Sequence, residues 1–246
     1  MTLYENPELY DALLPCSPEH VHFYDDVAQA HPGAMLELAC GSGQIIVPIA
    51  RRALRAVGLD TSPHMLKAAR RRASEGAPVE FVEADMRTFD LGERFSMIFV
   101  ARNSLLHLLD ADDIAALFSS VRRHLTDDGV FAFDIFNPSL RALAREAGER
   151  YPVMRVASRS HGELTVEATN DYDAATQVNR ATWFVSTPTQ RDQWVSPLHL
   201  RSIFPQELLA LLTANRFQLL RRDGDFAGAP FIGKSSRQVC QCRPIW

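Results

Sequence analysis

The sequence is poor in cysteine, and the cysteines that it has form no metal-binding pattern. Four occur among its 246 residues, at positions 16, 40, 240 and 242. A structural zinc site needs a framework of cysteines or histidines at short spacings, and none is present. His20 and His22 are two residues apart on an expected helix, where side chains do not face each other. We therefore predict no metal site, and free thiols in a reduced, cytoplasmic protein.

Long hydrophobic runs are missing as well. No uncharged stretch approaches the ~18 residues that a membrane-spanning helix requires. Residues 1–15, MTLYENPELYDALLP, are acidic and are interrupted by Pro7 and Pro15. They lack the basic and apolar regions of a signal peptide. We expect a cytoplasmic protein with no membrane partner.

The sequence also lacks a concentration of positive charge. The net charge is −4 at pH 7 and the isoelectric point is about 6.1, whereas nucleic-acid binding usually needs clustered positive charge. The one basic cluster, Lys67 with residues 70–72, falls late in an expected helix, where it suits the negative end of the helix dipole. We predict a small-molecule substrate and no nucleic-acid partner, with a monomer and a homodimer both left open.

Strands and helices alternate along the first part of the chain. Short apolar strands are expected at 34–39, 55–60, 79–83, 95–100 and 130–136. Helices are expected at 18–30, 43–53, from 61 onwards, and at 110–125, where apolar residues recur at helical spacing. This alternation predicts an α/β fold in which a mostly parallel sheet is covered by helices on both faces.

The alternation changes between residues 151 and 203, where short runs of alternating polar and apolar residues predict an antiparallel β insertion. A helix at 205–214 and strands at 217–222 and 237–243 follow. We predict one structural domain in three parts. Residues 1–150 form the ligand-binding core with an N-terminal helical lid, residues 151–203 form a β insertion that caps the substrate, and residues 204–246 complete the core sheet.

The stretch MLELACGSGQIIVP, residues 35–48, joins an expected strand to an expected helix through two glycines. Gly41 and Gly43 allow a tight turn and a close approach of the backbone to a ligand. The third glycine of the dinucleotide fingerprint G-x-G-x-x-G is replaced by Ile46, which is too large for that position. Asp60 ends the next strand, where a carboxylate can accept hydrogen bonds from both ribose hydroxyls of an adenosine.

The third strand ends in EADM, residues 83–86. A carboxylate followed by methionine, here Asp85 and Met86, suits the exocyclic amine and the flat ring of adenine. These strand ends provide groups for an amino-acid tail, a ribose and an adenine, but none for phosphates.

The motifs ELACGSGQ, GLDTSPHML, EADM and RHLTDDGVFAFDIF resemble the successive motifs of class I S-adenosyl-L-methionine-dependent methyltransferases, over residues 35–136. The resemblance implies a doubly wound, Rossmann-like sheet of seven strands with an antiparallel last strand. It implies S-adenosyl-L-methionine as cofactor and S-adenosyl-L-homocysteine as product. It also implies the cofactor-binding residues, which are Glu37, Ala39, Gly41 and Gly43 for the methionine half, Asp60 for the ribose, Met65 for the ribose or adenine, Asp85 and Met86 for the base, and Ala101 for the amino group.

The segment ARNSLLHLL, residues 101–109, resembles the S-x-x-H-L segment of aminosugar N,N-dimethyltransferases and of related small-molecule N-methyltransferases, including those of glycine type. That resemblance implies that His107 is a catalytic base or a group that binds the acceptor. A histidine that only caps the next helix remains the alternative. Tyr10 resembles a tyrosine that covers the active site in this family, and Asn103 is a candidate for the cavity wall.

Further candidates rest on the residues alone. His199 and Arg201 share one face of an extended chain, and they are candidates for contact with a polar substrate group. Asp134, in the middle of an expected strand, is interpreted as a structural residue.

The predicted function is methyl transfer from S-adenosyl-L-methionine to a small molecule, with an amine nitrogen as the first choice. An O-methyltransferase acting on a carboxylate or hydroxyl is the alternative. An NAD-dependent oxidoreductase is disfavoured by Ile46 and by the pair Asp85 and Met86. A non-catalytic cofactor-binding protein is the remaining possibility.

Overall fold

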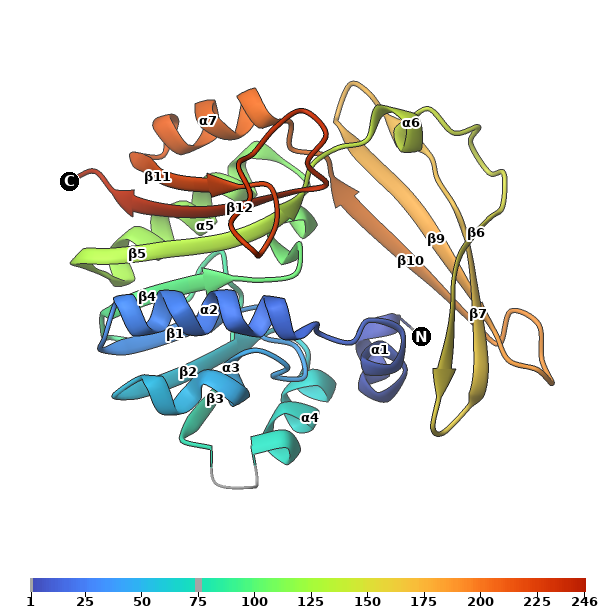
Figure 1. The fold of residues 1–246 in the computed structure, drawn as a ribbon, viewed down its shortest axis with the longest axis horizontal. Helices are drawn as coiled ribbons and strands as arrows, with labels where there is room; N and C mark the ends of the chain where they lie inside the picture. Colours follow the sequence, from blue (N-terminus) through green and yellow to red (C-terminus); the bar gives the residue numbers. More distant parts are fainter. Residues whose placement is uncertain (1, 74–76) are drawn as a thin grey trace.

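Residues 2–73 and 77–246 are described by a computed structural model, which contains a seven-stranded sheet and a smaller antiparallel sheet. Figure 1 shows the small sheet to the right of the large sheet, with helix α1 between the two sheets. The strands of the large sheet run in the order β11-β12-β5-β4-β1-β2-β3. Their bounds are β1 (Ala34–Leu38), β2 (Arg55–Asp60), β3 (Val79–Glu83), β4 (Phe95–Val100), β5 (Leu125–Phe136), β11 (Phe217–Asp223) and β12 (Arg237–Pro244).

The pairings of the large sheet confirm the predicted fold. β1 pairs in parallel with β2 and β4, and β2 pairs in parallel with β3. β4 pairs in parallel with β5, whereas β12 is antiparallel to both β5 and β11. The strand order reverses between β1 and β4, and ligands of such folds bind at this point beyond the carboxyl ends of the strands.

Alternate residues of the strands enter two different cores. On β1, Leu36 and Leu38 pack on the side that also holds Ile114 of α5 (Ala111–His124) and Leu208 of α7 (Pro205–Ala214). Met35 packs on the opposite side, with side chains of the helices α2 (Pro18–Ala30), α3 (Ile46–Ile49) and α4 (Pro63–Ala73). Burial on both faces explains the nearly continuous apolar sequence of the central strands.

The glycine loop keeps α3 shorter than the sequence predicts. The expected helix over 43–53 appears as α3 followed by the 3-10 turn η2 (Ala50–Arg52). Gly41 and Gly43 have φ values of +55° and +75°, which a right-handed helix excludes. The fifth strand is longer than the expected range of 130–136. β5 begins at Leu125, which pairs with Phe95, and a register shift separates this pair from the rest of the ladder.

The predicted β insertion forms the second sheet, which is antiparallel in the order β10-β9-β7-β6, with β8 paired to β9. Its strands are β6 (Tyr151–Ser158), β7 (Gly162–Thr169), β8 (Tyr172–Asp173), β9 (Val178–Ser186) and β10 (Trp194–Arg201). The short helix α6 (Leu140–Leu143) precedes it.

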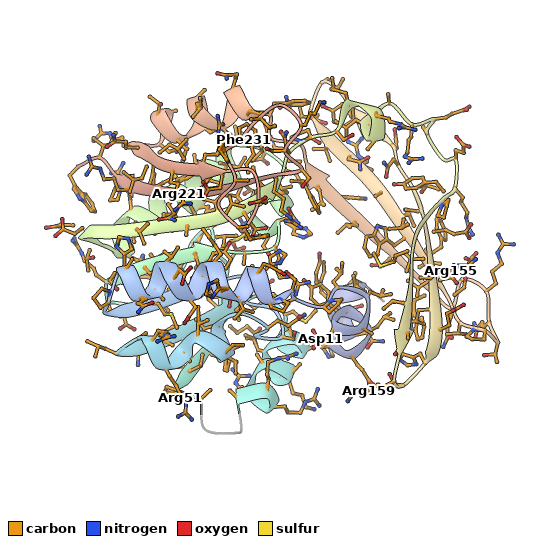
Figure 2. The ribbon with its side chains drawn as sticks, in the orientation of Figure 1. Asp11, Arg51, Arg155, Arg159, Arg221 and Phe231 are labelled. Carbon is orange, nitrogen blue, oxygen red and sulfur yellow. The ribbon has the colours of Figure 1, made fainter. Side chains whose placement is uncertain are left out.

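The N-terminal segment, made of η1 (Leu3–Glu5) and α1 (Pro7–Leu13), links the two sheets. Leu3, Leu9 and Leu13 form a buried cluster with Leu164, Val166 and Val185 of the second sheet. On its other side, Asp11 of α1 faces the core (Figure 2), where its carboxylate accepts hydrogen bonds from Ser42 Oγ at 2.6 Å and Gln44 Nε2 at 2.8 Å. Among the described residues, no helix combines the length and apolar character needed to cross a membrane.

Candidate functional site

A cavity of about 670 Å³ lies at the carboxyl ends of the core strands, between the two sheets. Its volume falls in the range of small-molecule sites, about 300–1,000 Å³. One side is lined by strand-end and helix residues of the core: Ala39, Gly41, Asp60, Thr61, Ser62, Met65, Met86, Arg102, Asn103, Ser104 and His107. The opposite wall is mostly apolar and comes largely from the second sheet and the end of β5: Phe136, Val153, Met154, Trp183, Leu198 and Leu200.

The two glycines of the loop have different surroundings. A Cβ atom built on Gly41 meets no heavy atom within 4 Å, so this position opens onto the cavity. A Cβ on Gly43 falls 3.0 Å from Val47 Cγ2 and 3.3 Å from Ala69 Cβ. Gly43 therefore permits the close packing of the loop against α4, and it is not among the residues that line the cavity. Ala39 does line it, with a left-handed φ of 53°.

Asp60 is held at the end of β2 by backbone donors. Its carboxylate accepts hydrogen bonds from the N–H of Gly41 and the N–H of Ser62, each at 2.8 Å. Burial raises its pKa, and these two hydrogen bonds oppose the rise. Each carboxylate oxygen has a further lone pair, so Asp60 can still accept from a ligand hydroxyl. The open space at Gly41 therefore lies beside a fixed acceptor.

Asp85 lines a neighbouring cavity of about 280 Å³ together with Met86, and it is engaged by an arginine that the sequence analysis overlooked. Arg87 donates to both carboxylate oxygens of Asp85, through Nε at 3.0 Å and Nη2 at 2.6 Å. It also donates to Asp113 at 2.7 Å. The hydrogen bonds from Arg87 lower the pKa of Asp85. The backbone N–H of Arg87 also donates to Asp85 Oδ1 at 2.8 Å, so Asp85 is a carboxylate fixed by Arg87 at the edge of this cavity.

Glu37, Ala101 and Met65 lie on the core side of the site. Glu37 is buried and accepts a hydrogen bond from the N–H of Ile46 at 3.0 Å, while burial raises its pKa. Glu37 and Ala101 line a small recess that shares Ala39 and Gly41 with the large cavity. Met65 is buried on α4 and lines the large cavity directly.

His107 lines both the 670 Å³ and the 280 Å³ cavity, on the 3-10 turn η3 (Ser104–His107). Its Nε2 shares a hydrogen bond of 2.8 Å with the hydroxyl of Tyr4, and the two rings meet edge to face. Burial lowers the pKa of His107 to about 4 and raises the pKa of Tyr4. The pair is therefore uncharged at neutral pH and presents hydrogen-bonding groups rather than a charge.

Tyr10 and Asn103 also line the large cavity. The guanidinium of Arg102 lies over the Tyr10 ring, with its Cζ atom 5.2 Å from the ring centroid. Arg102 and Asn103 have consecutive left-handed φ values of 59° and 65°. The Arg102 N–H donates to the buried carboxylate of Asp134 at 2.8 Å, which helps to hold this sharp turn at the end of β4. Strained backbone of this kind often occurs at ligand sites.

His199 and Arg201 do not reach the cavity. Their spacing places both on one face of β10, but Leu198 and Leu200 face the cavity instead. His199 is exposed, and Arg201 forms an ion pair with Glu207 at 2.8 Å. The pairing of β10 with β9 fixes this orientation, because one residue along a strand exchanges the two faces. The expectation that these two side chains meet the substrate is not supported by their positions.

Sequence reasoning missed several cavity residues, among them Tyr4, Met154, Trp183 and Arg237. Each lies outside the recognised motifs. For Leu198 and Leu200 a signal did exist, because apolar residues on one side of an amphipathic strand are expected to face the enclosed side.

The low pKa values of two histidines predict how stability depends on pH. Burial lowers the pKa of both His20 and His107 to about 4, while an unfolded chain binds these protons near pH 6.5. Between pH 4 and pH 6.5 the unfolded chain binds more protons at these two histidines than the folded protein does. Their contribution to the free energy of unfolding is therefore fully present above pH 6.5 and is lost as the pH falls toward 4. The slope is at most about 1.4 kcal/mol per pH unit for each histidine, and less for His20, which solvent reaches more easily.

Chemical denaturation at several pH values between 4 and 7 measures this slope. The variant His107→Gln should show a shallower dependence than the unaltered protein. Equal slopes for the two proteins would mean that His107 does not remain neutral in the folded state.

Comparison with known proteins finds similarity to methyltransferases. Residues 35–129 match the family model described as a methyltransferase domain. The putative methyltransferase YqeM of Bacillus subtilis (strain 168) is 25% identical over 233 residues, which cover 93% of this chain and 92% of that protein. The dTDP-3-amino-3,6-dideoxy-alpha-D-glucopyranose N,N-dimethyltransferase of Streptomyces fradiae is 33% identical over 97 residues, 39% of this chain and 37% of that protein.

The fold is also that of a solved methyltransferase. The crystal structure of an S-adenosylmethionine-dependent methyltransferase from Clostridium acetobutylicum ATCC 824 superposes with a TM-score of 0.80 at 17% identity, and the alignment covers 96% of each chain. At this identity the likeness establishes the fold alone.

Proposed function

We propose that this chain is an S-adenosyl-L-methionine-dependent methyltransferase, as its similarities support, and that it methylates an amine nitrogen of a small molecule. The cofactor supplies a methyl group that its sulfonium has already activated for displacement. The protein must then hold the acceptor's lone pair in line with that carbon and exclude water.

The cofactor would extend along the core side of the cavity. We propose that its methionine tail lies over Ala39 and Gly41, with Glu37 and the Ala101 carbonyl beside the amino group. Asp60 would accept hydrogen bonds from the ribose, with Met65 packed nearby, and Asp85 and Met86 would hold the adenine. Gly43 would act indirectly, by allowing the loop to pack closely on α4.

The observation that carries the amine proposal is the neutral His107, which lines both cavities. An amine attacks only in its unprotonated form, and its remaining N–H needs an acceptor. A histidine whose pKa is about 4 is uncharged at neutral pH, so it does not repel the cofactor's positive charge. It is too weak a base to keep the released proton. Its Nε2 is bound to the Tyr4 hydroxyl, so Nδ1 would accept from the amine N–H, with the ring proton on Nε2, while water takes the released proton afterwards.

The rest of the cavity favours an unprotonated amine. The wall of Phe136, Met154, Trp183 and Leu200 is apolar, and desolvation lowers the pKa of an ammonium group. The guanidinium of Arg102 lowers it further by charge repulsion. Tyr10 and Asn103 would contact the acceptor from the core side. The aminosugar N,N-dimethyltransferase that shares 33% identity over part of the chain supports the same class of acceptor.

Replacing His107 by alanine should lower kcat roughly 10- to 100-fold, the range for the loss of a buried hydrogen-bond partner. Affinity for S-adenosyl-L-homocysteine should stay unchanged, because the tail, ribose and base contacts remain. His107→Gln should recover part of the rate, since glutamine still accepts a hydrogen bond. The exposed His64 on α4 provides the matched control, His64→Ala.

The measurement is transfer of labelled methyl groups to a panel of small amines. A drop of only a few-fold in His107→Ala would remove this residue from the reaction. Failure to methylate any amine, with normal cofactor binding, would instead favour a protein that binds the cofactor without catalysis.

Methylation of a carboxylate oxygen is the second candidate, because the side chains of Arg102 and Arg237 line the same cavity. Guanidinium groups bind carboxylates well. The two products differ in chemistry, since a methyl ester is hydrolysed by mild base and an N-methyl group is not. Base-stable label in the product supports the amine acceptor, and release of the label as methanol supports the carboxylate.

A further inference from the structure

Arg237 is the first residue of β12, and its guanidinium lines the large cavity. In the sheet, β12 lies on the opposite side of β1 from β3, the strand that Asp85 follows, so Arg237 lies at the far end of the cavity from Asp85. The Nη1 atom of Arg237 donates to Asp134 Oδ2 at 3.0 Å. The guanidinium lies over the Phe136 ring at 4.9 Å and the Phe226 ring at 5.3 Å. Within the described parts of the chain, its remaining N–H donors have no hydrogen-bond partner. The hydrogen bond from Nη1 and the two aromatic rings therefore fix the orientation of the Arg237 guanidinium. Its other N–H groups are available to a ligand.

Positive charge exceeds negative charge at this end of the cavity. Arg102 approaches from the end of β4, and its Nη2 donates to the carbonyl of Leu14. Among the residues that the structure describes, no carboxylate pairs with the Arg102 guanidinium. Asp134 is fully buried and already accepts hydrogen bonds from Tyr24 and Arg237. Asp60, which also lines the cavity, is fixed beside Gly41 on the cofactor side.

His20 adds a neutral donor from the first turn of α2. Its Nδ1 shares a hydrogen bond of 2.8 Å with Ser17 Oγ, and its ring packs on Phe226 at 3.9 Å. If the serine hydroxyl donates to Nδ1, the proton of the neutral ring is on Nε2. That nitrogen has no partner among the described residues.

We propose that Arg237, Arg102 and His20 form an anion subsite that binds a carboxylate or phosphate group of the acceptor. The acceptor would then be an amine that also carries an anionic group, so the inference rests on the proposed N-methylation. A planar guanidinium recognises both kinds of oxyanion through paired hydrogen bonds, and the buried surroundings strengthen them.

The subsite is separate from the place proposed for the methionine tail. Arg237 and His20 line only the large cavity, whereas the recess around Glu37 and Ala101 does not include them. Arg102 lines both. Arg237 is therefore the residue whose substitution separates acceptor binding from cofactor binding.

The first test needs no knowledge of the acceptor. Inorganic phosphate and acetate should each raise the melting temperature relative to chloride at equal ionic strength, although part of the rise with phosphate is non-specific. Arg237→Gln should abolish the site-specific part, and the anion for which that part is larger identifies the kind of group bound. Arg243→Gln, at the other end of β12 and bound only to Gln218 among the described residues, should retain the site-specific part. Equal responses from the two variants would overturn the proposal.

The second test compares acceptors in matched sets, each with a carboxylate, a phosphate or a neutral substituent at the same distance from the amine. Methylation of the anionic members should be favoured, and Arg237→Gln should raise their KM about 10- to 100-fold, the range for a lost charged hydrogen bond. Neutral acceptors should be affected only a few-fold. Arg237→Lys, which keeps the charge but loses the planar guanidinium, should fall between.

The outcomes separate this proposal from the proposed function. Anion binding that depends on Arg237, without methylation of any amine, would reject the function and keep the subsite. Methylation of neutral and anionic amines with equal efficiency would reject the subsite and keep the function. Weaker binding of S-adenosyl-L-homocysteine to Arg237→Gln, with unchanged binding of 5′-methylthioadenosine, would assign Arg237 to the cofactor's carboxylate and also overturn the proposal.

Discussion

Replacing Asp134 by alanine is expected to lower the free energy of unfolding by about 3–5 kcal/mol, the range for breaking a buried ion pair. Asp134 is fully buried on β5. Its carboxylate accepts hydrogen bonds from Tyr24 Oη at 2.8 Å, the Arg102 N–H at 2.8 Å and Arg237 Nη1 at 3.0 Å. Removing it leaves two buried donors and a guanidinium without their acceptor, and such groups are costly to leave unpaired.

Urea denaturation measures this loss, and an exposed ion pair gives the control. Asp127 pairs with Arg94 at 3.2 Å, with side chains that are 83% and 55% exposed. Asp127→Ala should change the stability by no more than about 1 kcal/mol. A loss below 1 kcal/mol for Asp134→Ala would show that Asp134 does not hold the ends of β4, β5 and β12 together.

Replacing Asp60 by alanine is expected to weaken binding of S-adenosyl-L-homocysteine by about 1–3 kcal/mol, or roughly 5- to 150-fold. The carboxylate is already positioned by the N–H groups of Gly41 and Ser62. The ribose hydroxyls would lose a prepared, charged acceptor. Asp60→Asn keeps one acceptor oxygen and should lose less.

Isothermal titration calorimetry gives both affinities directly. Asp90→Ala, which alters an exposed carboxylate that lines none of the cavities described above, serves as the control. Affinity that is unchanged in Asp60→Ala would remove this residue from the cofactor site.

The sequence predicted the core well because local patterns determine it. Strand positions followed from short apolar runs between turn-forming residues, and a strand end marks one edge of a parallel sheet. Gly41, Asp60 and Met86 lie at the carboxyl ends of three different strands, so the sequence order of the strands was enough to bring them to one cavity. The absence of a third glycine was equally informative, because Ile46 is fully buried against the sheet where a dinucleotide would need close approach.

The acceptor side was harder to predict because it is built from contacts between distant segments. Tyr4 meets His107 across 103 residues of sequence, and Arg237 meets Asp134 across the same separation. No local pattern indicates such pairs. For His199 and Arg201, period-two alternation correctly put both on one face but could not determine which face, since that depends on how β10 pairs with β9. Arg87 was missed for a different reason, because the motif attracts attention to Asp85 and not to the arginine that fixes it.

The measurement that tests the account most directly is an experimental structure of the complex with S-adenosyl-L-homocysteine. The account predicts the ribose within hydrogen-bond distance of Asp60, about 2.6–3.2 Å, the adenine against Met86, and the sulfur facing the cavity that His107 and Arg237 line. A cofactor seated elsewhere, or a sulfur that points away from this cavity, would contradict it.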